Sequence, residues 1–174
     1  MSDDDLLKLC GWGQGRTSGP GGQNRNKVET QVTLTHTETG LSAVAGERRT
    51  VKENRRVALR RLRLKLATEH RCVVPAGPIG SALWRSRLRK RKGPVDPVFG
   101  GAGGTLSINP EHRDYPSLLA EALDTIAAAN WEVRDAAVRL DISTSQLVKL
   151  VKEHPAALAM LNKEREQRGM RTLK

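Results

Sequence analysis

The sequence predicts an α+β protein: a small domain with a β-hairpin or sheet and a packed helix, then a basic linker, then a small all-α helical domain. Two observations support this order. Apolar and polar residues alternate between residues 30 and 45, whereas helical periodicity covers 51–69 and returns after 115. The 174 residues suit one ordinary domain or two small ones. We expect domain boundaries that give segments 1–70, 71–113 and 114–174.

The first part of the chain is rich in glycine. Six glycines fall within twelve positions: Gly11, Gly13, Gly15, Gly19, Gly21 and Gly22. Because ordered glycine loses backbone entropy and adds no packing, we expect a loop here, not the interior of a helix or strand. A P-loop is excluded because no Gly-Lys pair occurs, and a dinucleotide fingerprint would follow a strand and open a long helix.

Two strands and one helix follow this stretch. The alternation in Thr30–His36 and in Leu41–Ala45 predicts a hairpin whose turn ends at Gly40. A helix is predicted over 51–69, with Thr50 and Glu53 as a capping-box pair at its start.

Charge indicates the class of partner. Residues 1–113 hold 21 Lys and Arg against 10 Asp and Glu, whereas residues 114–174 hold nine of each, so the whole net charge of +11 lies in the first segment. Clustered cations of this kind favour a polyanion such as RNA. An anionic membrane fits less well, and we expect no membrane association, because the basic stretches carry few apolar anchors.

The segment 71–113 has the composition of a connector. Prolines and a glycine cluster at 100–104 surround six positive charges within eight residues, 85–92. Both a short helix over 81–92 and flexible backbone fit this composition.

The C-terminal segment is helical, and residues 133–151 have helix-turn-helix dimensions. Ser143 and Gln146 form a second capping-box pair. Residues 118–152 resemble the factor-for-inversion-stimulation type of helix-turn-helix. Its predicted recognition helix carries only Lys149 and Lys152, so we expect docking to protein or structured RNA more than the reading of DNA.

A longer motif surrounds the glycines. The run Arg16-Thr17-Ser18-Gly19-Pro20-Gly21-Gly22-Gln23-Asn24-Arg25-Asn26-Lys27 resembles the signature of class I peptide chain release factors and their ribosome-rescue relatives. The resemblance continues through the predicted hairpin to Arg49 and Asn54 and covers about residues 5–70.

The resemblance implies hydrolysis of the peptidyl-tRNA ester in the ribosomal peptidyl transferase centre. It implies that Gly21, Gly22 and Gln23 are the catalytic residues, with the Gln23 N–H stabilising developing charge. By the same resemblance and from charge, the residues expected to bind RNA are Arg16, Ser18, Asn26, Lys27, Arg49, Arg55, Arg85, Arg87, Arg89, Lys90, Arg91 and Lys92.

The resemblance also implies the type of factor. We expect a codon-independent rescue factor, because the 174 residues leave no room for a stop-codon-reading domain. The expected partners are large-subunit rRNA and peptidyl-tRNA, with residues 85–92 either in the mRNA channel or on small-subunit rRNA, or simply solvated. A cytoplasmic monomer without metal or cofactor is expected. The alternative is a nucleic-acid-binding adaptor or regulator that uses the helix-turn-helix and lacks hydrolase activity.

Overall fold

A computed structural model describes residues 2–16, 28–75, 80–90 and 104–174, and its described residues form two compact units, Met1–Leu66 and Ala67–Lys174. They contain a three-stranded sheet, a two-stranded sheet and seven helices, which confirms the predicted α+β class. We call the two parts unit 1 and unit 2. No helix in the described part of the chain is long and apolar enough to cross a membrane.

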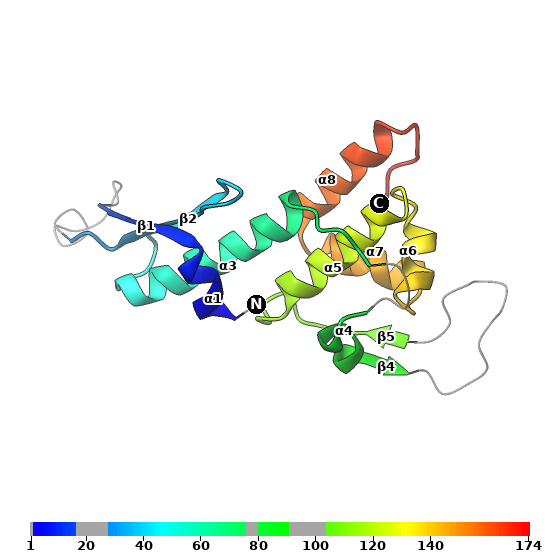
Figure 1. Cartoon of the computed structure of the whole chain (residues 1–174), viewed down its shortest axis with the longest axis horizontal. Coiled ribbons are helices and arrows are strands. Elements are labelled where there is room, and N and C mark those ends of the chain that lie inside the picture. Colours follow the sequence, from blue (N-terminus) through cyan, green and yellow to red (C-terminus); the bar gives the residue numbers. More distant parts are fainter. Residues whose placement is uncertain (1, 17–27, 76–79, 91–103) are drawn as a thin grey trace. The chain divides into compact units, whose positions relative to one another are not determined.

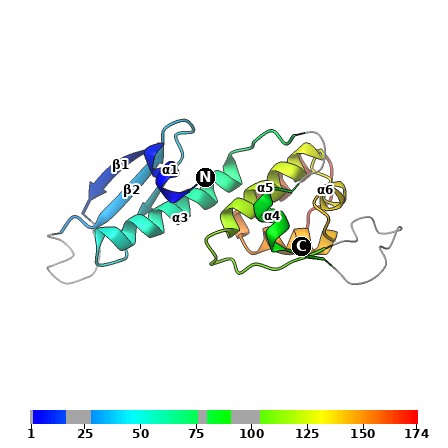
Figure 2. The same cartoon turned by 60° about the horizontal axis from the view of Figure 1, so that its bottom comes forward.

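Unit 1 contains a three-stranded antiparallel sheet with one long helix against it (Figures 1 and 2). Its elements are α1 (Asp3–Lys8), β1 (Cys10–Gly15), β2 (Gln31–His36), β3 (Ser42–Ala45) and α3 (Val51–Glu69), and the strand order is β1-β2-β3. The predicted hairpin is β2–β3 and the predicted helix is α3, so both predictions are confirmed.

The core of unit 1 lies between the sheet and α3. It is built from Leu6 of α1, alternate residues of β2 and β3, and the α3 residues Ala58, Leu59 and Leu62. At the start of α3, Thr50 accepts a hydrogen bond from the N–H of Glu53 at 3.2 Å, as the capping pattern predicts.

One prediction for this unit is wrong. The glycines Gly11, Gly13 and Gly15 lie inside strand β1, which pairs with β2 along its full length. In this edge strand the antiparallel ladder satisfies the backbone, so its hydrogen bonds offset the entropy cost of ordering glycine. The first strand of the sheet is therefore β1, which precedes the connection to β2, and not β2, as the sequence predicted.

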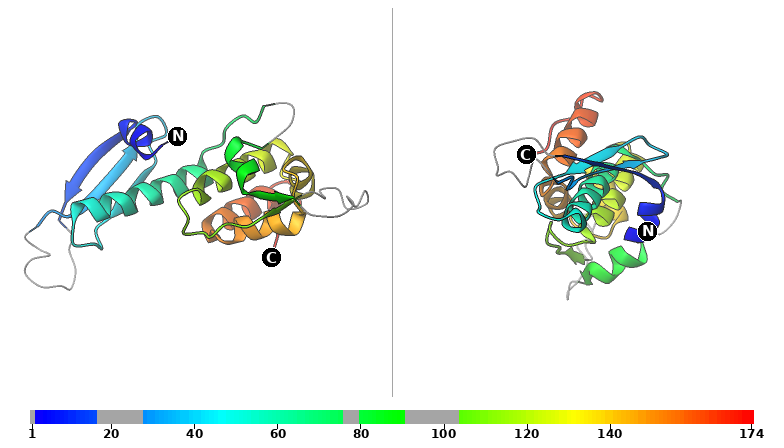
Figure 3. Two further views of the ribbon diagram at one scale, coloured as in Figure 1. Left: turned by 90° about the horizontal axis from the view of Figure 1, so that it is seen from below. Right: turned by 90° about the vertical axis from the view of Figure 1, so that its left-hand side faces the viewer.

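Unit 2 is mainly helical. Its elements are α4 (Ala82–Arg87), β4 (Leu88–Lys90), β5 (Gly104–Leu106), α5 (Tyr115–Ala128), α6 (Val133–Arg139), α7 (Thr144–Lys152) and α8 (Pro155–Glu166), with β4 and β5 antiparallel (Figure 3, left). The helices bury an apolar core that includes Leu119, Leu123, Ile126 and Leu147.

The described part of segment 71–113 belongs to unit 2. Trp84 of α4 is 1% exposed, and its indole N–H donates to the carbonyl of Leu140 at 3.0 Å. The N–H of Gly104 donates to the carbonyl of Asp141, which fastens β5 to the turn between α6 and α7. Residues 81–87 thus include a short helix, one of the two alternatives that the sequence leaves open.

The turn between α6 and α7 follows its prediction in part. Ser143 is the N-cap of α7 and accepts from the N–H of Gln146 at 3.3 Å. The side chain of Gln146 does not complete a capping box; its Oε1 accepts instead from the N–H of Leu106 at 2.9 Å. Strand β5 therefore braces the start of α7 and the turn before it.

Candidate functional site

The candidate site is the connection between β1 and β2. Gly15 and Gln31 are the last paired residues of the two strands, so both strands lead into the connection at the same end of the sheet. Arg16 and Glu29 stand on its two sides, with Arg16 Nε 3.3 Å from Glu29 Oε1. This exposed ion pair links the two ends of the connection and by itself stabilises little.

The residues between these ends include most of the predicted site. Those that lie outside the described residues are Ser18, Gly21, Gly22, Gln23, Asn26 and Lys27. Their assignments as catalytic or RNA-binding residues stay predictions. The structure does describe the two ends of the β1–β2 connection, from which these residues extend.

A buried amide fixes the second end of this support. Asn54 of α3 is fully buried, and its Nδ2 donates to the carbonyl of Thr30 at 2.6 Å and to that of Arg48 at 3.0 Å. Its Oδ1 accepts from the N–H of Arg48 at 2.9 Å. The side chain therefore binds the residue before β2 to the segment before α3, and it uses most of its hydrogen-bonding capacity to do so.

Sequence reasoning used Asn54 only as part of a resemblance and missed this role. A signal was present: Asn54 lies on the apolar face of α3, at helical spacing from Val51 and Ala58. A polar residue in that position is buried, and a buried amide needs partners.

The structure describes three of the residues of unit 1 that are predicted to bind RNA, and all three are arginines. Arg16 and Arg49 are exposed, and Arg55 of α3 lies over the ring of Trp12, with its Cζ 5.5 Å from the ring centroid. Trp12 itself is 46% exposed.

The basic run 85–92 is divided by the structure. Arg85 Nε donates to the carbonyl of Gly80 at 2.9 Å, and Arg87 forms an ion pair with Asp114 at 2.6 Å. Arg89 is exposed on β4. The side chain of Lys90, and Arg91 and Lys92 entirely, lie outside the described residues, and RNA binding by the run stays a prediction.

Besides the arginines described above, cationic side chains also gather along α7. An open groove of about 630 Å³ is lined by Thr144, Ser145, Val148, Lys149, Lys152, Glu153 and Lys174. Three lysines face one glutamate there, so the groove favours an anionic ligand. Within the described ranges no group of three or more His, Cys, Asp and Glu residues is placed to hold a metal ion.

Comparison of the sequence with known proteins identifies a domain family over this part of the chain. The RF-1 domain family matches residues 11–73, which include β1 from Gly11 onward, the whole connection, the hairpin and α3. Residues 11–73 therefore belong to the RF-1 domain family, and the chain is similar to peptide chain release factors. The sheet and α3 of unit 1 are consistent with an RF-1 domain fold.

Several curated relatives are peptide chain release factors. The chain is 47% identical over 51 residues to peptide chain release factor 1 of Chlorobaculum tepidum, covering 29% of this chain and 14% of that protein. It is 40% identical over 62 residues to that of Acidiphilium cryptum, covering 36% and 18%. For peptide chain release factor 1 of Streptococcus thermophilus the identity is 32% over 143 residues, covering 78% and 36%.

The chain thus spans between about a seventh and about a third of the length of these relatives. No solved structure gives a significant match.

Proposed function

We propose that this protein hydrolyses the ester of peptidyl-tRNA on the ribosome and does so without reading a codon. The observation that carries the proposal is that Gly21, Gly22 and Gln23 stand in unbroken order inside the segment that matches the RF-1 domain. The release-factor relatives support the same role and do not favour an adaptor without hydrolase activity.

The chemistry proposed for the tripeptide needs little from side chains. Gly21 and Gly22 have no Cβ, so the backbone can approach the reacting ester closely. The backbone N–H of Gln23 would donate to the oxygen on which negative charge develops. The side-chain amide of Gln23 would position the attacking water. Since ribosomal RNA surrounds the reaction, the chain need not supply a general base.

The described residues contribute by holding the ends of the loop. Preorganisation is valuable because a donor misplaced by about 1 Å can cost about a hundredfold in rate. In unit 1 the first end continues the β1 ladder, and the second end is fastened through Thr30 to buried Asn54. The loop therefore starts and ends on rigid elements.

Affinity for the ribosome would come from the cationic side chains. Arg16, Arg49 and Arg55 of unit 1 are proposed to contact large-subunit rRNA, and the run 85–92 to contact mRNA-channel or small-subunit rRNA phosphates. Because Arg87 is engaged by Asp114, we expect Arg89 to contribute more to that contact. The proposed site of action is the cytoplasmic ribosome, and the proposed active form is a monomer.

The catalytic part of the proposal is tested by peptide release from purified ribosomal complexes. Gln23→Ala and Gly22→Ala should abolish release while binding stays nearly unchanged, because the loop acts at the reaction step and the basic surfaces supply affinity. Glu38→Ala, in the exposed turn of the β2–β3 hairpin, is the matched control and should release normally. Equal release by Gln23→Ala and the unaltered protein would refute the hydrolase proposal.

Codon independence is tested in the same system. Release should be similar from complexes with a stop codon, a sense codon or no codon in the A site. A strict requirement for a stop codon would contradict this part and leave the hydrolase part standing.

A further inference from the structure

The aromatic residue of unit 1 lies on its surface instead of in its core. Trp12 is the single aromatic residue in the sequence from 1 to 66, yet the core of this unit is built from Leu, Val and Ala. Trp12 is 46% exposed, whereas Trp84 and Trp131 of unit 2 are 1% and 8% exposed. Exposed indole surface forgoes the gain of burial, so a role outside packing is indicated.

The position of Trp12 follows from the register of the sheet. Trp12 pairs directly with Leu34, whose side chain is buried, so both side chains lie on the face that α3 covers. Because β1 is the edge strand, the indole reaches the margin of that face, beside α3. There the guanidinium of Arg55 lies over the ring, 5.5 Å from its centroid.

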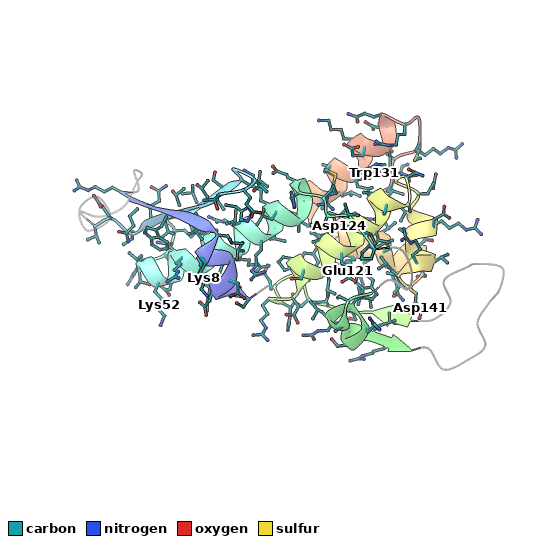
Figure 4. The ribbon with its side chains drawn as sticks, in the orientation of Figure 1. Lys8, Lys52, Glu121, Asp124, Trp131 and Asp141 are labelled. Atoms are coloured by element: carbon teal, nitrogen blue, oxygen red, sulfur yellow. The ribbon has the colours of Figure 1, made fainter. Side chains whose placement is uncertain are left out.

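Further positive charge surrounds this pair. Lys52, which Figure 4 labels, lies three residues before Arg55 on α3 and therefore on the same side of the helix. Both side chains are exposed. Arg16 is exposed four residues beyond Trp12 along the chain, roughly 13 Å away at the rise of an extended strand. An exposed aromatic ring among cations is the arrangement that binds single-stranded nucleic acid, since bases stack on the ring and phosphates meet the cations.

We propose that Trp12 and Arg55 form a stacking platform for an unpaired RNA base, with Lys52 beside it for the adjacent phosphate. The platform lies next to the end of β1 that leads into the Gly21-Gly22-Gln23 connection. A base held there would help to position the loop, a step that rests on the proposed function. The stacking itself is independent of that function and is tested without ribosomes.

The test uses the fluorescence of the full-length protein. Titration with a six-nucleotide oligoadenylate should quench the exposed Trp12, whereas Trp12→Phe, which retains only the buried Trp84 and Trp131, should show no such quenching. The same oligomer with abasic ribose, and a duplex RNA of equal charge, should quench little, because neither offers a free base.

Affinities for a labelled oligoadenylate separate stacking from charge. Trp12→Ala should weaken binding about tenfold, whereas Trp12→Phe, which keeps a ring, should weaken it less. Arg55→Lys keeps the charge and loses the planar group, so it should weaken binding severalfold. Arg56→Ala, the matched loss of an exposed charge on the same helix, should cost less than Arg55→Ala.

Two results would overturn the platform: equal affinity for the base-containing and abasic oligomers, or no quenching of Trp12 at saturation. Equal losses for Arg55→Ala and Arg56→Ala would also overturn it, since they would mean that charge alone binds the RNA. Failure here with normal peptide release would leave the proposed function intact. Normal stacking without release would refute the function and keep the platform.

Discussion

Asn54 offers the sharpest test of how the candidate loop is supported. Asn54→Ala removes three hydrogen bonds and leaves the carbonyls of Thr30 and Arg48 and the N–H of Arg48 without this partner. At about 1 kcal/mol for each bond, the free energy of unfolding of unit 1 should fall by about 3 kcal/mol. This is a large share of the roughly 5–15 kcal/mol by which domains are stable.

The assay is amide hydrogen exchange of the full-length protein, followed by mass spectrometry in peptides that cover β2 and residues 46–50. A loss of about 3 kcal/mol corresponds to exchange roughly a hundredfold faster for amides that exchange through unfolding of unit 1. Lys52→Ala, two residues earlier on the same helix and exposed, is the control and should shift stability by less than about 0.5 kcal/mol. Similar exchange in Asn54→Ala and the control would refute the idea that Asn54 braces the loop.

Two further predictions concern unit 2 and the thiols. Arg71 Nη1 lies 2.9 Å from Asp124 Oδ1, yet burial raises the pKa of Asp124 and lowers that of Arg71, so burial disfavours both charges. Replacing both residues, as Arg71→Met with Asp124→Leu, should therefore leave the free energy of unfolding in urea unchanged or raise it. Either change alone should lower it, because the remaining charge is left without its partner. Because the pKa of Asp124 is higher in the folded than in the unfolded protein, its contribution to stability is lost as pH rises through the folded pKa. The double variant should not show this dependence of stability on pH. If stability depended on pH equally in the double variant and the unaltered protein, Asp124 would not be its source. Burial also raises the pKa of the half-buried Cys10 thiol, whereas Cys72 is exposed, so maleimide at pH 7.5 should label Cys72 first, as peptide mapping would show; faster labelling of Cys10 would contradict this.

The sequence predicted the elements whose signal is local. The β2–β3 hairpin, α3 and the helices after residue 114 follow from the spacing of apolar residues, and the caps at Thr50 and Ser143 follow from residue type. Strand β1 could not be predicted this way, because Gly11 and Gly13 have little strand propensity and the strand forms through pairing with β2.

The role of the segment 71–113 depends on tertiary contacts. Its composition of proline, glycine and charge is that of a connector, but the buried Trp84 and the bond from Gly104 to Asp141 fasten its described part to the helices. One aromatic residue therefore outweighs the local composition, because its burial removes a large apolar area from water. For the candidate site, the sequence indicated the tripeptide by resemblance, whereas Asn54 and the exposed Trp12 needed the register of the sheet.

The division of the chain into units 1 and 2 changes which residues are expected to bind RNA phosphates. Divided at residue 113, the chain places its whole net charge in the first part, which predicts that residues 114–174 can be removed without changing nonspecific RNA affinity or its dependence on salt. The structural division is different: unit 1 holds 13 Lys and Arg against 7 Asp and Glu, and unit 2 holds 17 against 12. The net charges of +6 and +5 are nearly equal, so both units should contribute to phosphate binding.

Matched charge variants of the full-length chain test this without cutting a unit. One variant changes Lys52 and Arg56 of α3 to Gln, and the other changes Lys149 and Lys152 of α7, which line the cationic groove. Each neutralised phosphate contributes roughly 0.7–0.9 to the slope of log affinity against log salt, so each variant, which removes two charges, should lower the slope by up to about 1.4–1.8. The slope is measured by binding to naked ribosomal RNA from about 50 to 200 mM salt. If only the α3 variant changed the slope, Lys149 and Lys152 would take no part in nonspecific binding, and the prediction for the α7 groove would be wrong.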